Sequence, residues 1–256
     1  MRSWRRGRRW LAFALLLLSL AFLANVLYVT ASRTALVTIP VLLVLFGGLR
    51  FGWRTTVAPM LALAVVSAAL LWQTSLTVRQ RLTETFDEIR DYEPSGARTS
   101  AGERLEFWRK SIIFIADAPV LGHGTGSIRE QFRRAVVGDT GPAAAVAANP
   151  HNQIFAVAIQ LGLVGAALLL AMWGAHLLLF RGSGTWATIG LIVVVQNIIG
   201  SLFNSHLFDF MQGWIYVWGV GVLGGLWLRD SHSARIAKSV NTGTAQDGCA
   251  PRPHAQ

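Results

Sequence analysis

Cysteine and charge are what this chain has least of. A single cysteine, Cys249, occurs among 256 residues, so neither an intramolecular disulfide nor a cysteine-based metal site is possible. Only 14% of the residues are charged, whereas a soluble domain carries about 25%. The shortage is concentrated in runs of roughly 20 residues, which is the length that crosses the hydrocarbon core of a bilayer. We therefore predict an integral membrane protein.

What the chain has instead is a set of apolar stretches. We predict transmembrane helices at 10–30, 35–49, 55–73, 152–180, 186–204 and 211–228. Each must be helical because lipid offers no partners for backbone N–H and C=O groups. The expected fold class is all-α, a polytopic membrane protein of about six transmembrane helices with a large, partly helical loop. The chain thus divides into helices in 1–73, the loop 74–151, helices in 152–228 and a polar tail at 229–256, which we expect to be disordered.

Arginine and lysine in the short connections predict the orientation. Five lie at the amino end, two in the turn 50–54, one at Arg181 and four in the tail, against Arg33 alone in the opposite short loops. The positive-inside rule then places both termini in the cytoplasm and the loop 74–151 outside. The amino end also resembles a secretory signal peptide. Because its apolar run continues to about Val29, beyond the usual 7–15-residue signal core, we expect an uncleaved first helix.

The outer loop contains two predicted helices. Residues 82–92 alternate apolar and charged side chains at a spacing compatible with an amphipathic helix. Residues 102–116 place Leu105, Trp108 and Ile112 on one face, and Ala118-Pro119 ends this helix. A glycine-rich turn at 122–126 and a loosely specified segment at 138–148 follow.

Polar side chains that could carry chemistry gather on the outer side. They are Arg33, then Arg104 and Arg109, then His151 and Asn152, and finally His206 and Asp209. Each has a plainer interpretation: an interfacial anchor for Arg33, a solvated ion pair for Arg104, a helix cap at 149–152 and a connecting loop at 204–209. One histidine and one carboxylate are too few ligands to argue for zinc.

Taken together, these side chains favour one kind of substrate. Guanidinium groups bind phosphate in a bidentate manner, and histidine titrates near neutral pH. Such groups at an outer membrane boundary suit a lipid-linked phosphate or pyrophosphate. The net charge of +10 does not predict a nucleic-acid partner, because many basic residues border apolar stretches and they form no single patch.

Six short motifs follow one another between roughly residues 25 and 228: Ser32-Arg33-Thr34, Gly102-Glu103-Arg104-x-x-x-Trp108, Leu121-Gly122-His123-Gly124-Thr125-Gly126, Pro150-His151-Asn152, Gly162-x-x-Gly165 and Asn204-Ser205-His206-x-x-Asp209. Their order is more specific than any one of them, and in this order the chain resembles one known family. The family is the O-antigen ligase and polymerase family of bacterial envelope enzymes.

The resemblance implies glycan transfer from undecaprenyl pyrophosphate on the periplasmic face of the bacterial inner membrane. The acceptor would be a lipid A core for a ligase, or another carrier-linked repeat unit for a polymerase. The resemblance also implies no metal, no cofactor and no nucleotide sugar. The partners would be a lipid-linked oligosaccharide donor and a glycolipid or glycan acceptor within the membrane.

The resemblance also suggests roles for individual residues. Its important arginines would fall on Arg33 and Arg104, which would stabilise the departing pyrophosphate. Its loop histidine would be His151, which would orient or deprotonate the acceptor hydroxyl. Arg109, with Asn152, His206 and Asp209, would line the substrate site.

One departure from the family keeps other functions open. Family members usually have several more spans before the Ser-Arg segment, and this chain has one, which would suit a truncated or reduced member or a fragment that assembles with another subunit. A transporter or a non-catalytic membrane partner is the rival class. Ionisable residues at mid-membrane would favour transport, and His176 is the main example here.

Overall fold

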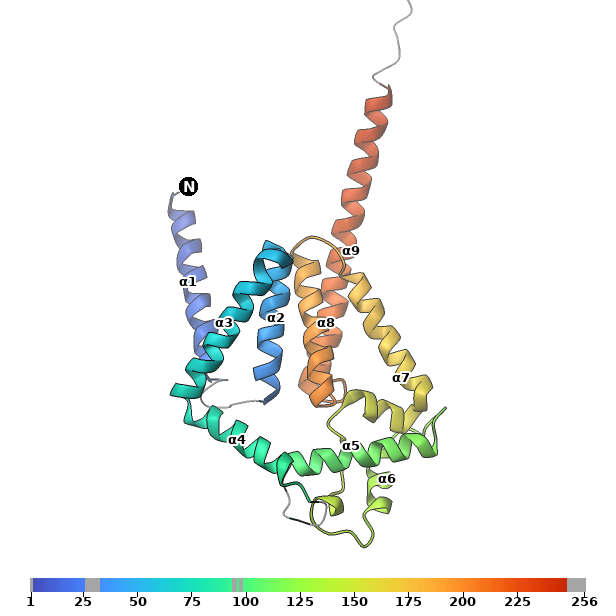
Figure 1. Cartoon of the computed structure of the whole chain (residues 1–256). Helices are drawn as coiled ribbons and strands as arrows, with labels where there is room; N and C mark the ends of the chain where they lie inside the picture. The colour runs from blue at the N-terminus through green and yellow to red at the C-terminus, as the bar shows by residue number, and fades with distance from the viewer. Residues whose placement is uncertain (1, 26–32, 94–95, 97–98, 248–256) are drawn as a thin grey trace, which may run out of the picture.

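The computed structural model describes residues 2–25, 33–93, 96 and 99–247, which form helices and no strands (Figure 1). The elements are α1 (Arg2–Ala24), α2 (Arg33–Phe51), α3 (Trp53–Thr74), α4 (Leu76–Arg90), α5 (Ser100–Asp117), α6 (Ile128–Ala135), the 3₁₀ turn η2 (Gly141–Ala144), α7 (Gln153–Leu179), α8 (Thr185–Phe203) and α9 (Phe210–Asp247). The prediction of an all-α polytopic membrane protein is confirmed.

The long helices run between the two ends of the molecule, while α4 and α5 lie across one end (Figure 1). The start of α1 and the end of α9 lie on the side away from α4, α5 and α6. Among the described residues, α3, α7 and α8 are long and apolar enough to cross a membrane, and Trp10–Ala24 and Val37–Phe51 are shorter apolar helical stretches. The predicted span 10–30 runs past Asn25 into residues outside the described ones.

Helix α8 occupies the middle of the membrane helices, where it contacts α2, α7 and α9. The shared core is a cluster of large side chains from α7, its C-cap, α8 and α9: Leu169, Trp173, Phe180, Val194, Tyr216 and Val220. A hydrogen bond of 2.6 Å between His176 Nδ1 and Tyr216 Oη also joins α7 to α9. His176 therefore has a polar partner within the membrane helices, and the pair adds to their packing.

Helix α7 is broken at Gly162, where the backbone takes φ 65° and ψ −163°. Residues 119–124 fill the break and replace the helical hydrogen bonds that are lost. The replacements run from His123 N to Ile159 O (2.9 Å), Gly124 N to Gln160 O (2.9 Å), Leu163 N to Pro119 O (2.7 Å) and Val164 N to Val120 O (3.3 Å). The first part of α7 therefore packs along α5, and the rest of α7 runs with the other long helices (Figure 1).

The segment from α4 to the first part of α7, called the outer layer after its predicted side, has a hydrophobic core of its own between α5, α6 and the first part of α7. Its largest members are Phe107, Phe114, Phe132 and Ile159. Lys110 is buried beneath the connection after α6, where its ammonium group donates to Asp139 (2.8 Å) and to the carbonyls of Ala143 (2.6 Å) and Ala135 (3.3 Å). These bonds fix an otherwise irregular loop to α5.

The predicted helices of the loop are present, with different bounds. Of the predicted helix 82–92, residues 82–90 belong to α4, which begins earlier, is capped by Ser75 and ends at Arg90. Residues 102–116 lie within α5, which is capped by Thr99. The structure differs at the tail: α9 continues without interruption to Asp247, where we expected disorder from Arg229 onward. Extending an existing helix needs no new nucleus, and Pro251 is the first proline after Arg229, so a polar sequence can remain helical. Residues 248–256 lie outside the described ones.

Candidate functional site

His151 begins the candidate site, at the junction where the outer loop enters α7. Its backbone is left-handed (φ 55°), and it is the non-glycine residue with positive φ among the described residues. The side-chain carbonyl of Asn149 accepts from His151 N (2.8 Å) and holds this turn. Asn152 then caps α7 by accepting from Ile154 N (2.9 Å) and Phe155 N (3.1 Å). A strained residue held by its neighbours in this way is typical of functional sites.

The imidazole of His151 is fixed on two sides. Its Nδ1 lies 3.1 Å from Asn204 Oδ1, in the loop between α8 and α9. Its ring stacks on Phe107 of α5, with 6.1 Å between ring centroids and 21° between planes. One position further along α5, Trp108 donates from Nε1 to Pro150 O (3.1 Å). The ring is therefore held by two segments that are far from it in the sequence, α5 and the α8–α9 loop.

The environment of His151 favours its neutral form. Burial lowers the pKa of His151, and the positive charge of Arg104 lowers it further. The hydrogen bond to Asn204 and the charges of Asp209 and Glu103 act in the opposite direction without cancelling the effect. An imidazole that is neutral near pH 7 has the form that a general base requires.

A cavity of about 340 Å³ lies beside this histidine loop, where α2, α4, α5 and the end of α8 meet. Its lining is mostly apolar, with Arg104 as the charged member. The lining residues are Thr34, Val37, Leu82, Thr85, Ile89, Ala101, Arg104, Leu105, Trp108 and Phe203. Arg104 and Trp108 lie on the same face of α5 as Phe107, because they occupy positions i, i+4 and i+3 of the helix. The same face of α5 therefore lines the cavity and contacts the His151 ring.

The structure brings together two of the three residues predicted to be catalytic. Arg104 lines the cavity, and its charge reaches His151. Arg33 begins α2, but its side chain lies outside the described part of the chain. The next residue, Thr34, lines the same cavity as Arg104. The start of α2 therefore reaches the cavity that the prediction requires.

Arg109 occupies a different environment from Arg104. It forms an ion pair with the buried carboxylate of Glu106 (2.8 Å), which also accepts from Tyr92. Burial favours the neutral form of Glu106, but the hydrogen bonds from Arg109 and Tyr92 outweigh it and lower its pKa. Burial, followed by the hydrogen bond to Glu106, raises the pKa of Tyr92 to about 12. These three side chains join α5 to the end of α4, and Arg109 does not line the cavity.

The remaining predicted binding residues lie in or next to the α8–α9 loop. Asp209 accepts from Asn204 Nδ2 (2.9 Å), and Asn152 donates to Leu202 O (3.2 Å). The ring of His206 is buried against Gly200, and burial lowers its pKa while Asp209 acts in the opposite direction. Asp209 is therefore linked to His151 by hydrogen bonds through Asn204. The roles of His206, Asp209 and Asn152 in substrate binding stay predictions.

Sequence reasoning missed two asparagines at the centre of the site. Asn149 and Asn204 form hydrogen bonds with each other (3.1 Å) and with His151. Asn204 lies in a motif that the sequence singled out and Asn149 directly precedes one, but asparagine has no charge and commonly caps turns and helices. A sequence signal did exist, since each asparagine lies two residues before a motif histidine, His151 or His206.

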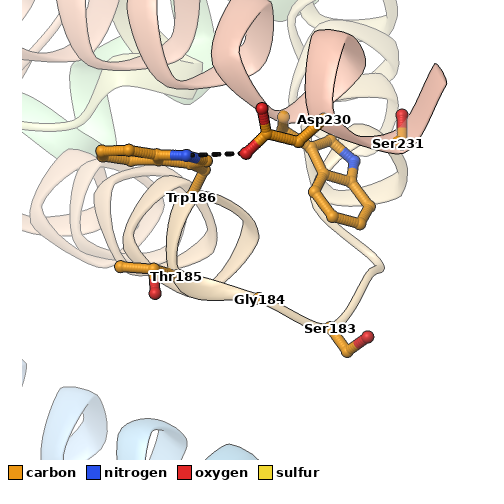
Figure 2. A pocket seen from close by; sticks show the side chains of 7 residues that line it. Ser183, Gly184, Thr185, Trp186, Asp230 and Ser231 are labelled. Atoms are coloured by element: carbon orange, nitrogen blue, oxygen red, sulfur yellow. Dashed lines mark hydrogen bonds between the residues drawn. The ribbon is translucent and has the colours of Figure 1, made fainter. Parts of the chain in front are cut away.

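A second cavity, of about 560 Å³, lies at the opposite end of the membrane helices. It is bounded by the turn before α8 and by Trp227, Asp230 and Ser231 of α9. Figure 2 shows the ring of Trp186 pointing toward Asp230, to which its Nε1 donates (3.1 Å). This cavity contains none of the predicted site residues.

The fold and the site define a polytopic membrane protein with a polar, histidine-containing site beside an apolar cavity at one end of its membrane helices. Residues 18–170 match the family described as O-Antigen ligase, and the chain therefore belongs to the O-antigen ligase family. It is also 25% identical, over 205 residues, to an uncharacterized protein of Haemophilus influenzae (strain ATCC 51907 / DSM 11121 / KW20 / Rd). That match covers 77% of this chain and 50% of the relative, so the chain spans about half the length of the curated relative it matches.

Proposed function

We propose that this protein transfers a glycan from a polyprenyl-pyrophosphate carrier to an acceptor hydroxyl at the periplasmic face of the bacterial inner membrane. The single observation that carries the proposal is the juxtaposition of Arg104, an apolar cavity and a neutral, oriented His151. Family membership supports the class of reaction. The donor, the acceptor and the membrane face are parts of the proposal.

The cavity suits a lipid-linked phosphate for a physical reason. Its apolar lining from α2, α4 and α8 would receive the carrier chain near the membrane, and the guanidinium group of Arg104 would bind the phosphate oxygens. A cation at this position would stabilise the negative charge that grows on the leaving group in the transition state. Arg33 is proposed as the second cation, because it precedes the cavity residue Thr34.

The reaction would be a direct displacement. The acceptor oxygen would attack the anomeric carbon while the bond from that carbon to the pyrophosphate oxygen breaks, and the polyprenyl pyrophosphate would leave with the electron pair. His151 would take the proton of the acceptor hydroxyl. One displacement inverts the anomeric centre. General-base assistance of this kind typically contributes about 10²–10⁴-fold to a rate.

The test is a transfer assay with the full chain reconstituted in liposomes. A polyprenyl-pyrophosphate-linked oligosaccharide is the donor, and a lipid A core glycolipid is the acceptor. We expect wild-type transfer, and losses of at least about 10²-fold for Arg104→Ala and His151→Ala. Arg104→Lys keeps the charge but loses the bidentate fork, so it should retain partial activity. Full activity in both alanine variants would exclude these roles.

The matched control for Arg104 is another arginine of the outer layer. Arg133 on α6 is mostly exposed and pairs with Glu130 (2.7 Å), and it does not line the cavity. Arg133→Ala should therefore transfer glycan at the wild-type rate. Lengthening of the donor glycan in the absence of the glycolipid would identify a polymerase instead of a ligase. Substrate movement across the liposome without transfer would favour the transport class.

A further inference from the structure

We propose that Asn204, held by Asp209, is a positioning residue that keeps the proton of the neutral His151 ring on Nδ1 and leaves Nε2 as the basic nitrogen. The inference deepens the proposed function and rests on it for its catalytic meaning. Its structural content is independent, because it concerns which ring nitrogen carries a hydrogen. A chain of hydrogen bonds runs from the backbone N–H of His151 through Asn149 and Asn204 to the carboxylate of Asp209.

The first end of the chain is the backbone N–H of His151, which is a donor only. It donates to Asn149 Oδ1 (2.8 Å), and Ser205 Oγ also donates to that oxygen (2.7 Å). The amide of Asn149 therefore has one allowed orientation, with its Nδ2 toward Asn204. That Nδ2 lies 3.1 Å from Asn204 Oδ1 and donates to it.

The other end of the chain is the carboxylate of Asp209, which accepts when ionised. Asn204 Nδ2 donates to Asp209 Oδ2 (2.9 Å). Turning the Asn204 amide over would place its oxygen against a carboxylate and its NH₂ group against that of Asn149. Both ends of the chain thus require the same orientation of Asn204, with Oδ1 toward Asn149 and His151.

The orientation of Asn204 determines the tautomer of the histidine. A side-chain amide oxygen accepts hydrogen bonds and cannot donate them. The His151 Nδ1 that lies 3.1 Å from Asn204 Oδ1 must therefore carry a hydrogen. In the neutral imidazole the other nitrogen, Nε2, then holds the lone pair. This is the nitrogen that would accept the proton of an acceptor hydroxyl.

An asparagine between the carboxylate and the histidine has an electrostatic consequence. The charged groups that act on His151 are Arg104 and Glu103 of α5 and Asp209 of the α8–α9 loop. A carboxylate in direct contact with the ring would favour the imidazolium form. The neutral amide transmits the orientation from Asp209 while keeping that charge one residue further away. His151 is thereby oriented and also stays neutral.

The direct test is NMR of the full chain in detergent, with ¹⁵N in the histidine rings. The two ring nitrogens give separate signals according to which one is protonated, and His151→Gln identifies the His151 pair by its loss. We expect wild-type His151 with a protonated Nδ1 and an unprotonated Nε2 at neutral pH. We expect Asn204→Ala to lose this single state and give a mixture of tautomers. A proton on Nε2 in the wild type would overturn the proposal, as would an unchanged tautomer in Asn204→Ala.

The transfer assay supplies the catalytic part of the test. Asn204→Ala should lower kcat by about 10²-fold with little change in KM, because general-base assistance is lost while the cavity is intact. Asn204→Asp keeps an acceptor but adds a negative charge beside the ring, which should raise the pKa of His151. The acidic limb of the plot of kcat against pH should therefore lie at higher pH in this variant than in the wild type. Arg133 is exposed and pairs with Glu130 outside this chain of hydrogen bonds, so Arg133→Ala is the control and should behave as the wild type.

The two proposals fail in different ways. A protonated Nδ1 in a protein that performs no transfer would remove the proposed function and leave the positioning role. Transfer at the wild-type rate by Asn204→Ala would overturn the positioning role and leave the proposed function.

Discussion

The ring of His151 lies nearly parallel to the ring of Phe107, with 6.1 Å between their centroids. Phe107 is one helical turn from Arg104, so α5 provides both a cover and a nearby positive charge for the histidine. Burial and the charge of Arg104 are the two causes that lower the pKa of His151. A helix distant in the sequence thus contributes to the protonation state of a residue just before α7.

The first prediction concerns pH. Because the pKa of His151 lies below the ordinary value of 6.5, a reaction that needs neutral His151 should lose activity only when the pH falls below 6.5. Arg104→Gln removes one of the two causes and should raise the pKa of His151. The measurements are kcat against pH for the wild type and NMR titration of His151 in both proteins. An acidic limb above 6.5, or an unchanged pKa in the variant, would contradict this account.

The second prediction concerns the glycines at the break in α7. Gly122 and Gly162 have positive φ values of 69° and 65°, and a Cβ on either would overlap backbone atoms of the other segment. A non-glycine residue held in so sparsely populated a backbone conformation costs about 1–3 kcal/mol, and the overlap adds to this cost. We expect Gly122→Ala and Gly162→Ala to lower the melting temperature in detergent and to reduce the yield of folded protein.

Gly174 is the matched control for this pair. It lies within α7, and a Cβ there would meet no atom within 4 Å. Gly174→Ala should leave the melting temperature unchanged or raise it, because alanine favours helix more than glycine does. Equal losses for Gly162→Ala and Gly174→Ala would mean that the break is not held by its close backbone contacts.

The third prediction concerns Lys110, which is buried and fully hydrogen-bonded beneath the loop after α6. Lys110→Met keeps the length of the side chain but leaves the carbonyls of Ala135 and Ala143 without their donor. An unsatisfied buried acceptor costs about 1–3 kcal/mol. We expect a lower melting temperature and faster proteolysis between 135 and 145. Arg133→Met, which breaks an exposed pair, should change neither.

The fourth prediction compares two asparagines of the α8 region. Asn197 is buried, and neither its Nδ2 nor its Oδ1 has a hydrogen-bond partner among the described residues. Asn204 has three side-chain partners. A buried polar group without a partner costs about 1–3 kcal/mol, so Asn197→Leu should raise the melting temperature in detergent. Asn204→Leu should lower it. A similar fall in the melting temperature of both variants would contradict the difference in hydrogen bonding between Asn197 and Asn204.

Hydrophobic patterning predicted most of the membrane part of this fold. The expected span 186–204 and helix α8 differ by one residue at each end, and 55–73 lies within α3. Patterning could not predict the break at Gly162, because the residues around it are as apolar as the rest of α7. The break depends on residues 119–124, which are distant in the sequence. The sequence predicts only a glycine-rich turn at 122–126, whereas in the structure His123 and Gly124 of that turn donate to the carbonyls left open at the break.

The candidate site, like the fold, could be predicted from the sequence only in part. The sequence singled out Arg104, His151 and Asp209 by residue type and by their place at the outer ends of the predicted helices. The family motif ranked Arg104 above Arg109, whereas helical spacing alone did not, because both lie on one helix about a turn and a half apart. The fold distinguishes them: Glu106 binds Arg109 as an ion pair, while Arg104 lines the cavity.

By itself the sequence determined that this chain is a helical membrane protein, since long uncharged runs in lipid have no alternative to helix. Only the tertiary structure decided that Asn149, Asn204 and Phe107 surround His151 and that α2, α4, α5 and α8 share a cavity. The physical reason is that hydrophobicity acts locally along the chain, whereas a hydrogen bond or a ring contact requires two particular side chains to meet. That meeting is fixed by the packing of whole helices, which no single segment encodes.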